Sequence, residues 1–348
     1  MPNNKKIKLG VIGAGLISQL CHISNYSKNK HCEILALADY RNKLREKVGK
    51  KFNIKYLYSN HKELLKNSEI DAVIIVTGRE NIGPVAYDCL KKKKHIFTEK
   101  PSAHTFFQAK KLVGLANKKK VKYVVGYMKR YDEGIKKAKK IFQYILKKKK
   151  FGKINFVRVH NFMGDSYCDP KNYIKSNESI PKDIPAWPKA PNWIKKKNIK
   201  HYAGYINTYC HDINLLRYFF DNEIKIKFTD LSKMNGRIAV FKIKDFLCSF
   251  ETGRSEYHIW DEEIEIYFDK GKIKLKLPVP LLKNRHCELS IYDAKKKIEK
   301  KLKIKNNVWS FKKQADEFIS LLRFNKKNLN PGKDALQDLK LLEKIWKY

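Results

Sequence analysis

Short apolar runs alternate with longer amphipathic stretches in the first third of the chain. The runs rich in β-forming residues predict strands at 7–12, 33–38, 72–77, 96–98 and 123–125, with a weaker strand near Tyr56. The stretches 41–52, 84–91 and 105–116 between them have the apolar spacing of helices. This alternation is typical of β-α-β units, whose right-handed crossovers place helices on both faces of a parallel sheet.

The pattern changes after residue 132. A basic amphipathic helix is expected at 132–146 and a strand at 154–160, and an irregular stretch then runs from Gly164 to Lys200. That stretch contains five prolines together with Trp187 and Trp193. Loops longer than about 15 residues are usually functional or disordered, and the two tryptophans argue against disorder. We therefore expect an ordered loop that shapes a binding site.

A helix is expected at 207–220, and five strand-like runs follow it. They lie at 225–230, 237–243, 246–251, 262–268 and 272–277, and helices at 310–323 and 333–346 close the chain. The connections between these strands are too short for helical crossovers, which predicts antiparallel pairing. The fold class expected is therefore α/β plus α+β. It has a doubly wound parallel sheet in residues 1–128 and an open, mainly antiparallel sheet domain in residues 129–348.

The formal net charge of +41 has two possible explanations, a nucleic-acid footprint or a surplus of lysine from A/T-rich codons. Of the 76 basic residues 66 are lysines, and their runs are scattered, mostly where helices would end. Recognition of phosphates or base edges usually needs arginine forks and one basic face with aromatic residues between. The distribution favours the codon explanation and no specific nucleic-acid partner.

Seven cysteines contain no C-x-x-C pair, so neither a disulfide framework nor a zinc site is predicted. No apolar stretch approaches the roughly 20 residues of a membrane-spanning helix. The apolar run after Lys5 and Lys6 superficially resembles a signal peptide, but it fits a strand and glycine turn better. We expect a soluble protein of the reducing cytoplasm that holds no metal.

The segment from Leu9 to Ser18, LGVIGAGLIS, follows a strand and opens a helix, which is the context that a G-x-G-x-x-G motif requires. Gly13 would allow the tight turn, and Gly15 would let the backbone approach a pyrophosphate at the helix N-terminus. Ser18 stands in place of the third glycine and is small enough for close packing. Leu16 and Ile17 complete the predicted dinucleotide-binding turn.

Asp39 ends the second predicted strand, 21 residues after Ser18. An acid there can accept hydrogen bonds from the adenosine ribose diol, which favours NAD over NADP. Arg41 lies two residues further on and could bind a 2′-phosphate, so NADP stays open. A glycine turn of an α/β protein without any dinucleotide is the competing interpretation.

Two further segments contain candidate catalytic residues. Lys100, in Phe97–Pro101, lies at the carboxyl end of a strand, where a lysine can bind a substrate hydroxyl or relay a proton. His211 lies four residues after Asn207, which places both on one helical face, and an imidazole can take a proton from an alcohol as hydride leaves the carbon. Taken alone, a lysine is usually a surface charge and a helical histidine is usually a packed or surface residue.

Five segments in order resemble the glucose-fructose oxidoreductase/inositol dehydrogenase/MocA (Gfo/Idh/MocA) family. They are Gly13-Ala-Gly15, Glu99-Lys100-Pro101, 126–131 (GYMKRY), 151–154 (FGKI) and 211–214 (HDIN). The resemblance covers nearly the whole chain, and the closing segment 311–346 looks like the family's return helices.

The resemblance implies an N-terminal NAD(P)-binding Rossmann domain and a C-terminal domain for substrate binding and assembly into dimers or tetramers. It implies hydride transfer between nicotinamide and a carbon of a sugar, polyol or nucleotide-linked sugar. In family terms Lys100 contacts the substrate and is followed by a proline that commonly forms a cis peptide, while His211 is the acid/base residue. Thr77 and Glu99 join Lys100 as expected cofactor contacts, and Tyr127 and Arg130 are candidates for substrate recognition.

The sequence departs from the family at two places. Inositol-dehydrogenase-like members carry an aspartate where this chain has Asn207, and asparagine cannot hold the charge that would raise a neighbouring histidine's basicity. The loop 77–83 lacks the Pro-Asn and histidine that the family often has. The leading hypothesis is an NAD(P)-dependent sugar or cyclitol oxidoreductase. A dinucleotide- and sugar-binding regulator without turnover, or an NAD-dependent glycosidase, are the alternatives.

Overall fold

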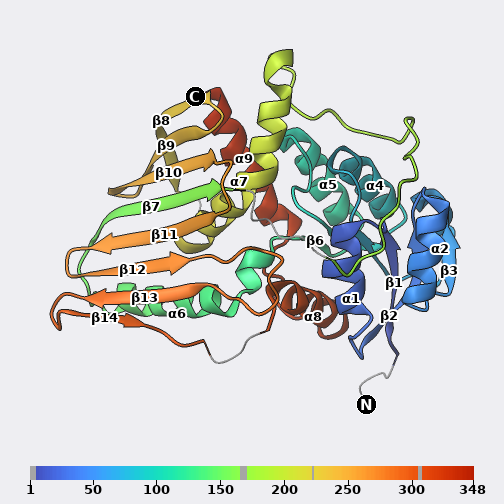
Figure 1. The fold of residues 1–348 in the computed structure, drawn as a ribbon, viewed down its shortest axis with the longest axis horizontal. Helices are drawn as coiled ribbons and strands as arrows, with labels where there is room; N and C mark the ends of the chain where they lie inside the picture. The colour runs from blue at the N-terminus through green and yellow to red at the C-terminus, as the bar shows by residue number, and fades with distance from the viewer. Residues whose placement is uncertain (1–4, 165–170, 222, 305–307) are drawn as a thin grey trace. The chain divides into compact units, whose positions relative to one another are not determined.

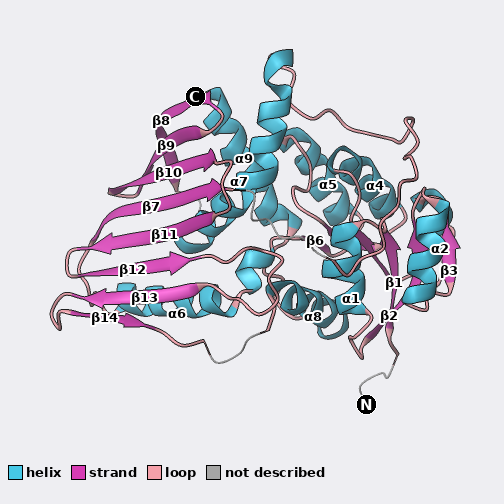
Figure 2. Cartoon of the chain, in the orientation of Figure 1, coloured by secondary structure: helices cyan, strands magenta, loops and turns pink. Residues whose placement is uncertain are grey.

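Two sheets organise the chain (Figures 1 and 2). The computed structural model describes residues 5–164, 171–221, 223–304 and 308–348. Each sheet belongs to one compact unit: the first unit comprises Met1–Tyr127, Pro170–Asn207 and Phe311–Leu339, and the second comprises Met128–Asp169, Thr208–Ser310 and Lys340–Tyr348. The predicted domains 1–128 and 129–348 stay a prediction.

The first unit contains a six-stranded parallel sheet in the order β3-β2-β1-β4-β5-β6. Its strands are β1 (Ile7–Ile12), β2 (Cys32–Ala38), β3 (Tyr56–Tyr58), β4 (Ala72–Ile75), β5 (His95–Thr98) and β6 (Tyr123–Val125). The chain adds β2 and β3 on one side of β1, and then β4, β5 and β6 on the other side. The direction of the crossovers therefore reverses between β1 and β4. The predicted doubly wound sheet is confirmed, and β1 and β6 have the predicted bounds.

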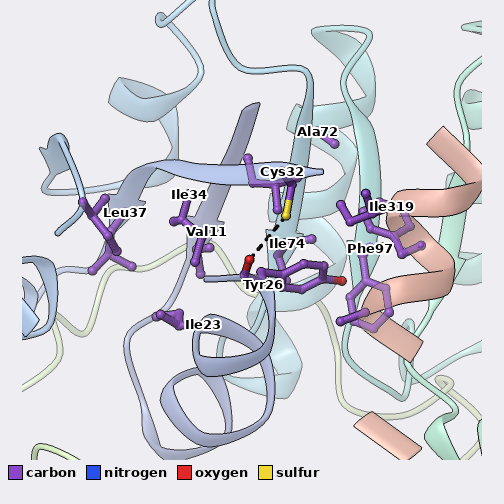
Figure 3. Packing of buried hydrophobic residues seen from close by; sticks show 14 of the residues in the cluster. Val11, Ile23, Tyr26, Cys32, Ile34, Leu37, Ala72, Ile74, Phe97 and Ile319 are labelled. Carbon is purple, nitrogen blue, oxygen red and sulfur yellow. Dashed lines mark hydrogen bonds between the residues drawn. The ribbon is translucent and has the colours of Figure 1, made fainter. Parts of the chain in front are cut away.

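Successive side chains of a strand point to opposite faces of the sheet, and each face is covered by its own helices. Leu9 and Val11 are fully buried in one core cluster with Tyr26, Phe97 and Phe318 (Figure 3). Gly10 points the other way, where a Cβ atom would lie 2.9 Å from the Leu64 side chain. The two faces therefore hold separate sets of helices.

The helices of the first unit connect its strands or return to them from the end of the chain. A π-helical segment η1 (Ser18–Ile23) continues into α1 (Ser24–Tyr26), and the others are α2 (Asn42–Lys51), α3 (His61–Leu64), α4 (Arg79–Lys91), α5 (Phe106–Lys118) and α8 (Ser310–Phe324). The side chain of Thr105 caps α5 by accepting from the backbone N–H of Gln108 at 3.1 Å.

Helix α4 begins five residues before the predicted start at Pro84, and this part of the prediction was wrong. Proline has no N–H to donate to the carbonyl four residues earlier, which belongs to Glu80. The backbone N–H of Trp187 donates to the Glu80 carbonyl oxygen instead, at 2.9 Å. A segment about a hundred residues away thus satisfies the carbonyl that Pro84 cannot.

The second unit contains an eight-stranded sheet in the order β14-β13-β12-β11-β7-β10-β9-β8. Its strands are β7 (Ile154–Met163), β8 (Ile224–Lys233), β9 (Gly236–Ile243), β10 (Phe246–Arg254), β11 (Trp260–Phe268), β12 (Gly271–Lys276), β13 (Glu288–Asp293) and β14 (Ile298–Lys301). Among the strand pairs of this sheet in the described residues, only β7–β10 is parallel, so the prediction of a mainly antiparallel sheet is confirmed. Helix α6 (Glu133–Lys147) packs against β12 and β13 (Figure 1).

Besides α4, further helical segments have bounds different from those predicted or were not predicted. Helix α7 (Ile199–Phe220) starts eight residues before the expected position 207, and α9 (Gly332–Lys347) agrees closely with 333–346. Two short 3₁₀ turns, η2 (Met128–Tyr131) and η3 (Lys196–Asn198), precede α6 and α7. None of the helices in the described residues is long and apolar enough to span a membrane.

Candidate functional site

The carboxyl ends of β1, β2 and β4 border a cavity of about 600 Å³ in the first unit. Of the predicted cofactor contacts, seven line it: Gly13, Gly15, Leu16, Ile17, Asp39, Arg41 and Thr77. The remaining wall includes Ile180, Pro181, Lys182, Ile184 and Ala186 from the long proline-containing loop. This is the position at which open α/β sheets bind their ligands.

Gly13 makes the turn after β1 possible. Its φ is +100°, a conformation that side chains rarely adopt, and a Cβ atom would lie 2.1 Å from the carbonyl oxygen of Val76. Its N–H donates to the Ala38 carbonyl oxygen at 2.8 Å, which ties the turn to β2. Any larger residue would push the loop off β4, so the sequence motif has the backbone role predicted for its first glycine.

Asp39 is the polar centre of the pocket and is buried. Its Oδ2 accepts from the Ala14 N–H at 2.7 Å, and its Oδ1 accepts from the Arg41 N–H at 2.9 Å. The Arg41 side chain forms a fork on the same carboxylate, with Nε to Oδ1 at 2.9 Å and Nη2 to Oδ2 at 2.8 Å. These hydrogen bonds raise the pKa of Arg41. The carboxylate thus joins the glycine turn to the end of β2.

The residues of this pocket fit a dinucleotide. A Cβ atom would fill the space at Gly13, while one at Gly15 would have only Arg41 Nη2 nearby, at 3.9 Å. The backbone between them can therefore be approached closely, as a pyrophosphate requires, and Asp39 supplies a carboxylate of the type that binds the adenosine ribose.

The loop from Ile174 to Pro188 is attached to the first unit along its length. Gln19 exchanges two hydrogen bonds with the backbone of Ile174, at 2.8 and 3.0 Å. Asn81 donates to the carbonyl oxygen of Pro185 at 3.0 Å, and Gln108 donates to that of Pro188 at 2.9 Å. Side chains near the strand ends therefore hold the loop that closes one wall of the pocket.

Glu99 is held by a different partner from the one expected. Its Oε1 lies 2.7 Å from Nε2 of His22, a histidine that is almost completely buried, and its Oε2 accepts from the Lys100 N–H at 3.1 Å. Its proposed contact with the cofactor stays a prediction. The structural role that can be seen is to fix the segment after β5.

Lys100 and Asn207, predicted from separate motifs, come together in the first unit. The Lys100 Nζ donates to the Asn207 carbonyl oxygen at 2.9 Å and lies 3.4 Å from its Oδ1. The Lys100–Pro101 peptide is cis, as the family resemblance implied. The lysine that was least distinctive by sequence alone therefore has a defined position beside α7.

His211 lies one turn beyond Asn207 on α7 and is half-buried, and its part of the helix belongs to the second unit. The neighbouring residue Asp212 belongs to a buried polar cluster of that unit. Asn161 donates to Asp212 Oδ2 at 2.9 Å, and Lys129 forms an ion pair with Glu262. Burial, followed by the charge of Glu262, raises the pKa of Asp212 well above its usual range.

Tyr127 and Arg130 are both buried, with 1% and 5% of their surface exposed. Asn330 donates to the carbonyl oxygen of Tyr127 at 2.9 Å, and Arg130 donates from Nη2 to the Asn214 carbonyl oxygen at 2.8 Å. These contacts give both residues packing roles. Their contact with substrate stays a prediction.

Sequence reasoning missed the detailed contacts of the loop and the cluster around Asp212. The loop residues that make these contacts have no spacing that marks them, and only their place in a long loop with prolines and tryptophans was a signal. The cluster draws Lys129, Asn161, Asp212 and Glu262 from four elements, so no local pattern could have predicted it.

Comparison with known proteins agrees with this geometry. Residues 7–127 match the model of the oxidoreductase family GFO_IDH_MocA, described as having an NAD-binding Rossmann fold. Myo-inositol 2-dehydrogenase of Thermotoga maritima is 22% identical over 279 residues, which cover 77% of this chain and 74% of the relative. An uncharacterized oxidoreductase of Bacillus subtilis, YrbE, is 31% identical over 139 residues, 40% of either chain.

Solved structures with low sequence identity share the fold over nearly the whole chain. A putative NADPH-dependent oxidoreductase of Desulfitobacterium hafniense has a TM-score of 0.76 at 15% identity and covers 97% of this chain and 94% of its own. A 3-ketoreductase of Actinomadura kijaniata, in complex with NADP and TDP-benzene, has a TM-score of 0.75 at 15% identity over 99% and 98%. The motifs, the pocket and these comparisons agree on similarity to the Gfo/Idh/MocA family of oxidoreductases, whose model matches residues 7–127.

Proposed function

We propose that the chain transfers a hydride between nicotinamide and a hydroxyl-bearing carbon of a sugar, cyclitol or nucleotide-linked sugar. The observation that carries the proposal is the pocket of the first unit, where Asp39 is fixed on the Ala14 N–H at the end of the glycine turn. The names of the relatives, inositol dehydrogenases and a 3-ketoreductase in complex with NADP and TDP-benzene, support this substrate class.

Each residue has a separate task in the proposed reaction. Asp39 accepts hydrogen bonds from the ribose diol, and the turn at Gly13 and Gly15 lets the pyrophosphate approach the backbone. Bound nicotinamide would supply or accept the hydride. Lys100 donates from Nζ to the reacting oxygen of the substrate, and the His211 imidazole takes or returns the hydroxyl proton.

Asn207 has a positioning task and favours a second candidate. Its carbonyl oxygen holds Lys100 Nζ at 2.9 Å, but its neutral amide adds no negative charge beside His211. A regulator that binds dinucleotide and sugar without turnover would tolerate this change. An NAD-dependent glycosidase would retain its cofactor and release a leaving group without net production of NADH.

Titration with NADH and NADPH, followed by fluorescence, tests the first step. Turnover is then measured over a panel of inositols, aldoses and nucleotide sugars. Oxidation of one class supports the proposal, whereas tight cofactor binding with no turnover on the panel supports the regulator. Binding of neither dinucleotide would refute the assignment of the pocket. Assembly as a homodimer or homotetramer also stays a prediction.

A further inference from the structure

Helix α2 begins with a carboxylate from a distant part of the chain at its N-terminus. The two oxygens of Glu178 accept from the backbone N–H groups of Lys43 and Leu44, each at 2.9 Å. Ser176 donates from Oγ to Glu178 Oε2 at 2.9 Å, and the Glu178 N–H donates back to that hydroxyl at 3.1 Å. The carboxylate is thus held on both sides.

Hydrogen bonding keeps this carboxylate charged. Partial burial would raise the pKa of Glu178, but the N–H groups of Lys43 and Leu44 and the Ser176 hydroxyl lower it below its usual value. Glu178 therefore occupies the end of α2 as an anion, in the manner of a bound phosphate or carboxylate.

The N-cap residue of this helix, Arg41, lines the pocket beside Asp39, at the part where the two dinucleotides would differ. NADP carries a phosphate on the 2′-oxygen of the adenosine ribose, and Asp39 is the residue placed to receive that ribose. Helix α2 starts three residues after Asp39. A 2′-phosphate needs backbone N–H groups at a helix N-terminus or an arginine fork nearby.

Both kinds of donor are already engaged by the chain's own carboxylates. The fork of Arg41 is on Asp39, and the N–H pair of Lys43 and Leu44 is on Glu178. The pKa of Arg41 is raised first by its hydrogen bonds to Asp39 and also by the charge of Glu178, so the two carboxylates act on the same region. A 2′-phosphate would approach two negative charges.

We propose that Glu178 is a specificity-determining residue that, together with Asp39, selects NAD(H) against NADP(H) by occupying the N-terminus of α2. The inference rests on the proposed function, in which this pocket binds a nicotinamide dinucleotide. It assigns a task in cofactor choice to the long loop, which the sequence suggested only as a contributor to substrate shape.

A purely structural role is the competing explanation. Glu178 would then cap α2 and fasten the loop, and its loss would lower stability without changing the ratio of the two cofactor affinities. The ratio of Kd values for NADPH and NADH distinguishes the two roles, because a general loss of stability affects both ligands alike.

The experiment uses the full chain and three variants: Glu178→Ala, Glu178→Gln and the control Asp183→Asn. Asp183 is exposed in the same loop, so its variant changes the charge of the loop by the same amount as Glu178→Gln. Kd values for NADH and NADPH are measured by fluorescence titration at fixed ionic strength, and thermal unfolding verifies that each variant is folded.

Wild type should bind NADH more tightly than NADPH. Glu178→Ala, which releases both N–H groups, should lower the NADPH/NADH ratio of Kd values by at least about tenfold. Glu178→Gln should change the ratio in the same direction by less, since its amide oxygen can still accept one bond. Asp183→Asn should leave the ratio within about twofold of wild type.

The outcomes separate the two proposals. Wild type that binds neither dinucleotide would refute the proposed function and this inference with it. Tight NADH binding with an unchanged ratio in Glu178→Ala would overturn the role of Glu178 alone. An equal change in Asp183→Asn would also overturn it, because loop charge rather than the α2 contact would then set the preference.

Discussion

Lys100 donates from Nζ to the backbone carbonyl oxygen of Asn207 at 2.9 Å, and the amide oxygen of the same residue lies 3.4 Å away. The two residues are 107 positions apart in sequence and lie in the same compact unit. The contact gives Lys100, one of 66 lysines, a fixed position, and Asn207 is the residue that holds its Nζ.

Lys100→Met should remove the proposed hydrogen-bond donor to the reacting oxygen while keeping a side chain of similar length. Steady-state turnover should fall by about 10²- to 10⁴-fold, whereas the Kd for NADH should change by less than about threefold. Lys118→Met, at the exposed end of α5, makes the same chemical change away from the site and serves as control. Turnover that survives in Lys100→Met would contradict the assigned role.

Asn207→Asp should introduce the acid that the family resemblance implies at this position. A negative charge one turn before His211 favours the protonated imidazole, so the acidic limb of the kcat/KM profile should move to higher pH by roughly 0.5 to 1 unit. The same substitution made in a His211→Asn background, where turnover is expected to be about 10²- to 10⁴-fold lower, should shift nothing. A limb that stays in place in the single variant would exclude His211 as the proton acceptor.

Asp39→Asn should weaken NADH binding by roughly tenfold, because the neutral amide accepts more weakly from a ribose diol and loses its ion pair with Arg41. The matched control is Asp71→Asn, since Asp71 also accepts from a backbone N–H, that of Lys8 near the amino end of β1. Equal weakening by both substitutions, measured by NADH titration, would indicate a general loss of stability rather than a lost cofactor contact.

Stability should fall in acid because of His104, which is almost completely buried. Burial lowers the pKa of His104 from 6.5 to about 4. Below pH 6.5 the unfolded chain binds a proton that the folded chain refuses, so stability is full above pH 6.5 and declines as pH falls toward 4. A pKa difference of that size between the unfolded and the folded chain corresponds to a loss of about 3 kcal/mol in the free energy of unfolding.

Denaturant unfolding of wild type and His104→Gln between pH 4 and 8 measures this effect. The free energy of unfolding of the variant should decline less steeply below pH 6.5 than that of wild type. The difference between the two proteins at pH 8 reports only altered packing, since the histidine is then neutral in the folded and the unfolded state. Parallel curves over the whole range would show that His104 does not cause the acid sensitivity.

Asp212 should have the opposite dependence. Its pKa is raised by burial and by the charge of Glu262, so the folded chain binds the proton more tightly and stability falls as pH rises above 3.8. Asp212→Asn mimics the protonated acid and should increase stability at pH 8 by about 1 to 2 kcal/mol. Loss of stability in Asp212→Asn would mean that the acid is charged in the folded state.

Lys129→Met, in the same cluster, should destabilise the protein by about 3 to 5 kcal/mol, because it leaves Glu262 buried without its ion-pair partner.

The elements best predicted from sequence were those whose own residues specify them. Strand β6 is a continuous apolar run that is buried in the parallel sheet, and β1 is apolar and buried from Leu9 to Ile12. The glycine turn needs a conformation that few residues other than glycine adopt. Of the missed strands, β14 (IEKK) is exposed throughout and β13 (ELSIYD) is short and has only one buried residue, so periodicity gave little signal. The early start of α4 was hidden because Pro84 usually marks a first turn, and its effect is compensated by Trp187.

The sequence by itself determined most of the order of strands and helices, the glycine turn, the acid at Asp39 and the candidates Lys100 and His211, because each depends on local conformation or on a motif in a fixed context. Tertiary structure alone decided which residues meet. It brought Lys100 to Asn207, engaged Arg41 on Asp39 and placed Glu178 at the N-terminus of α2. Contacts between side chains from distant segments depend on how the whole chain packs, and no spacing within one segment encodes them.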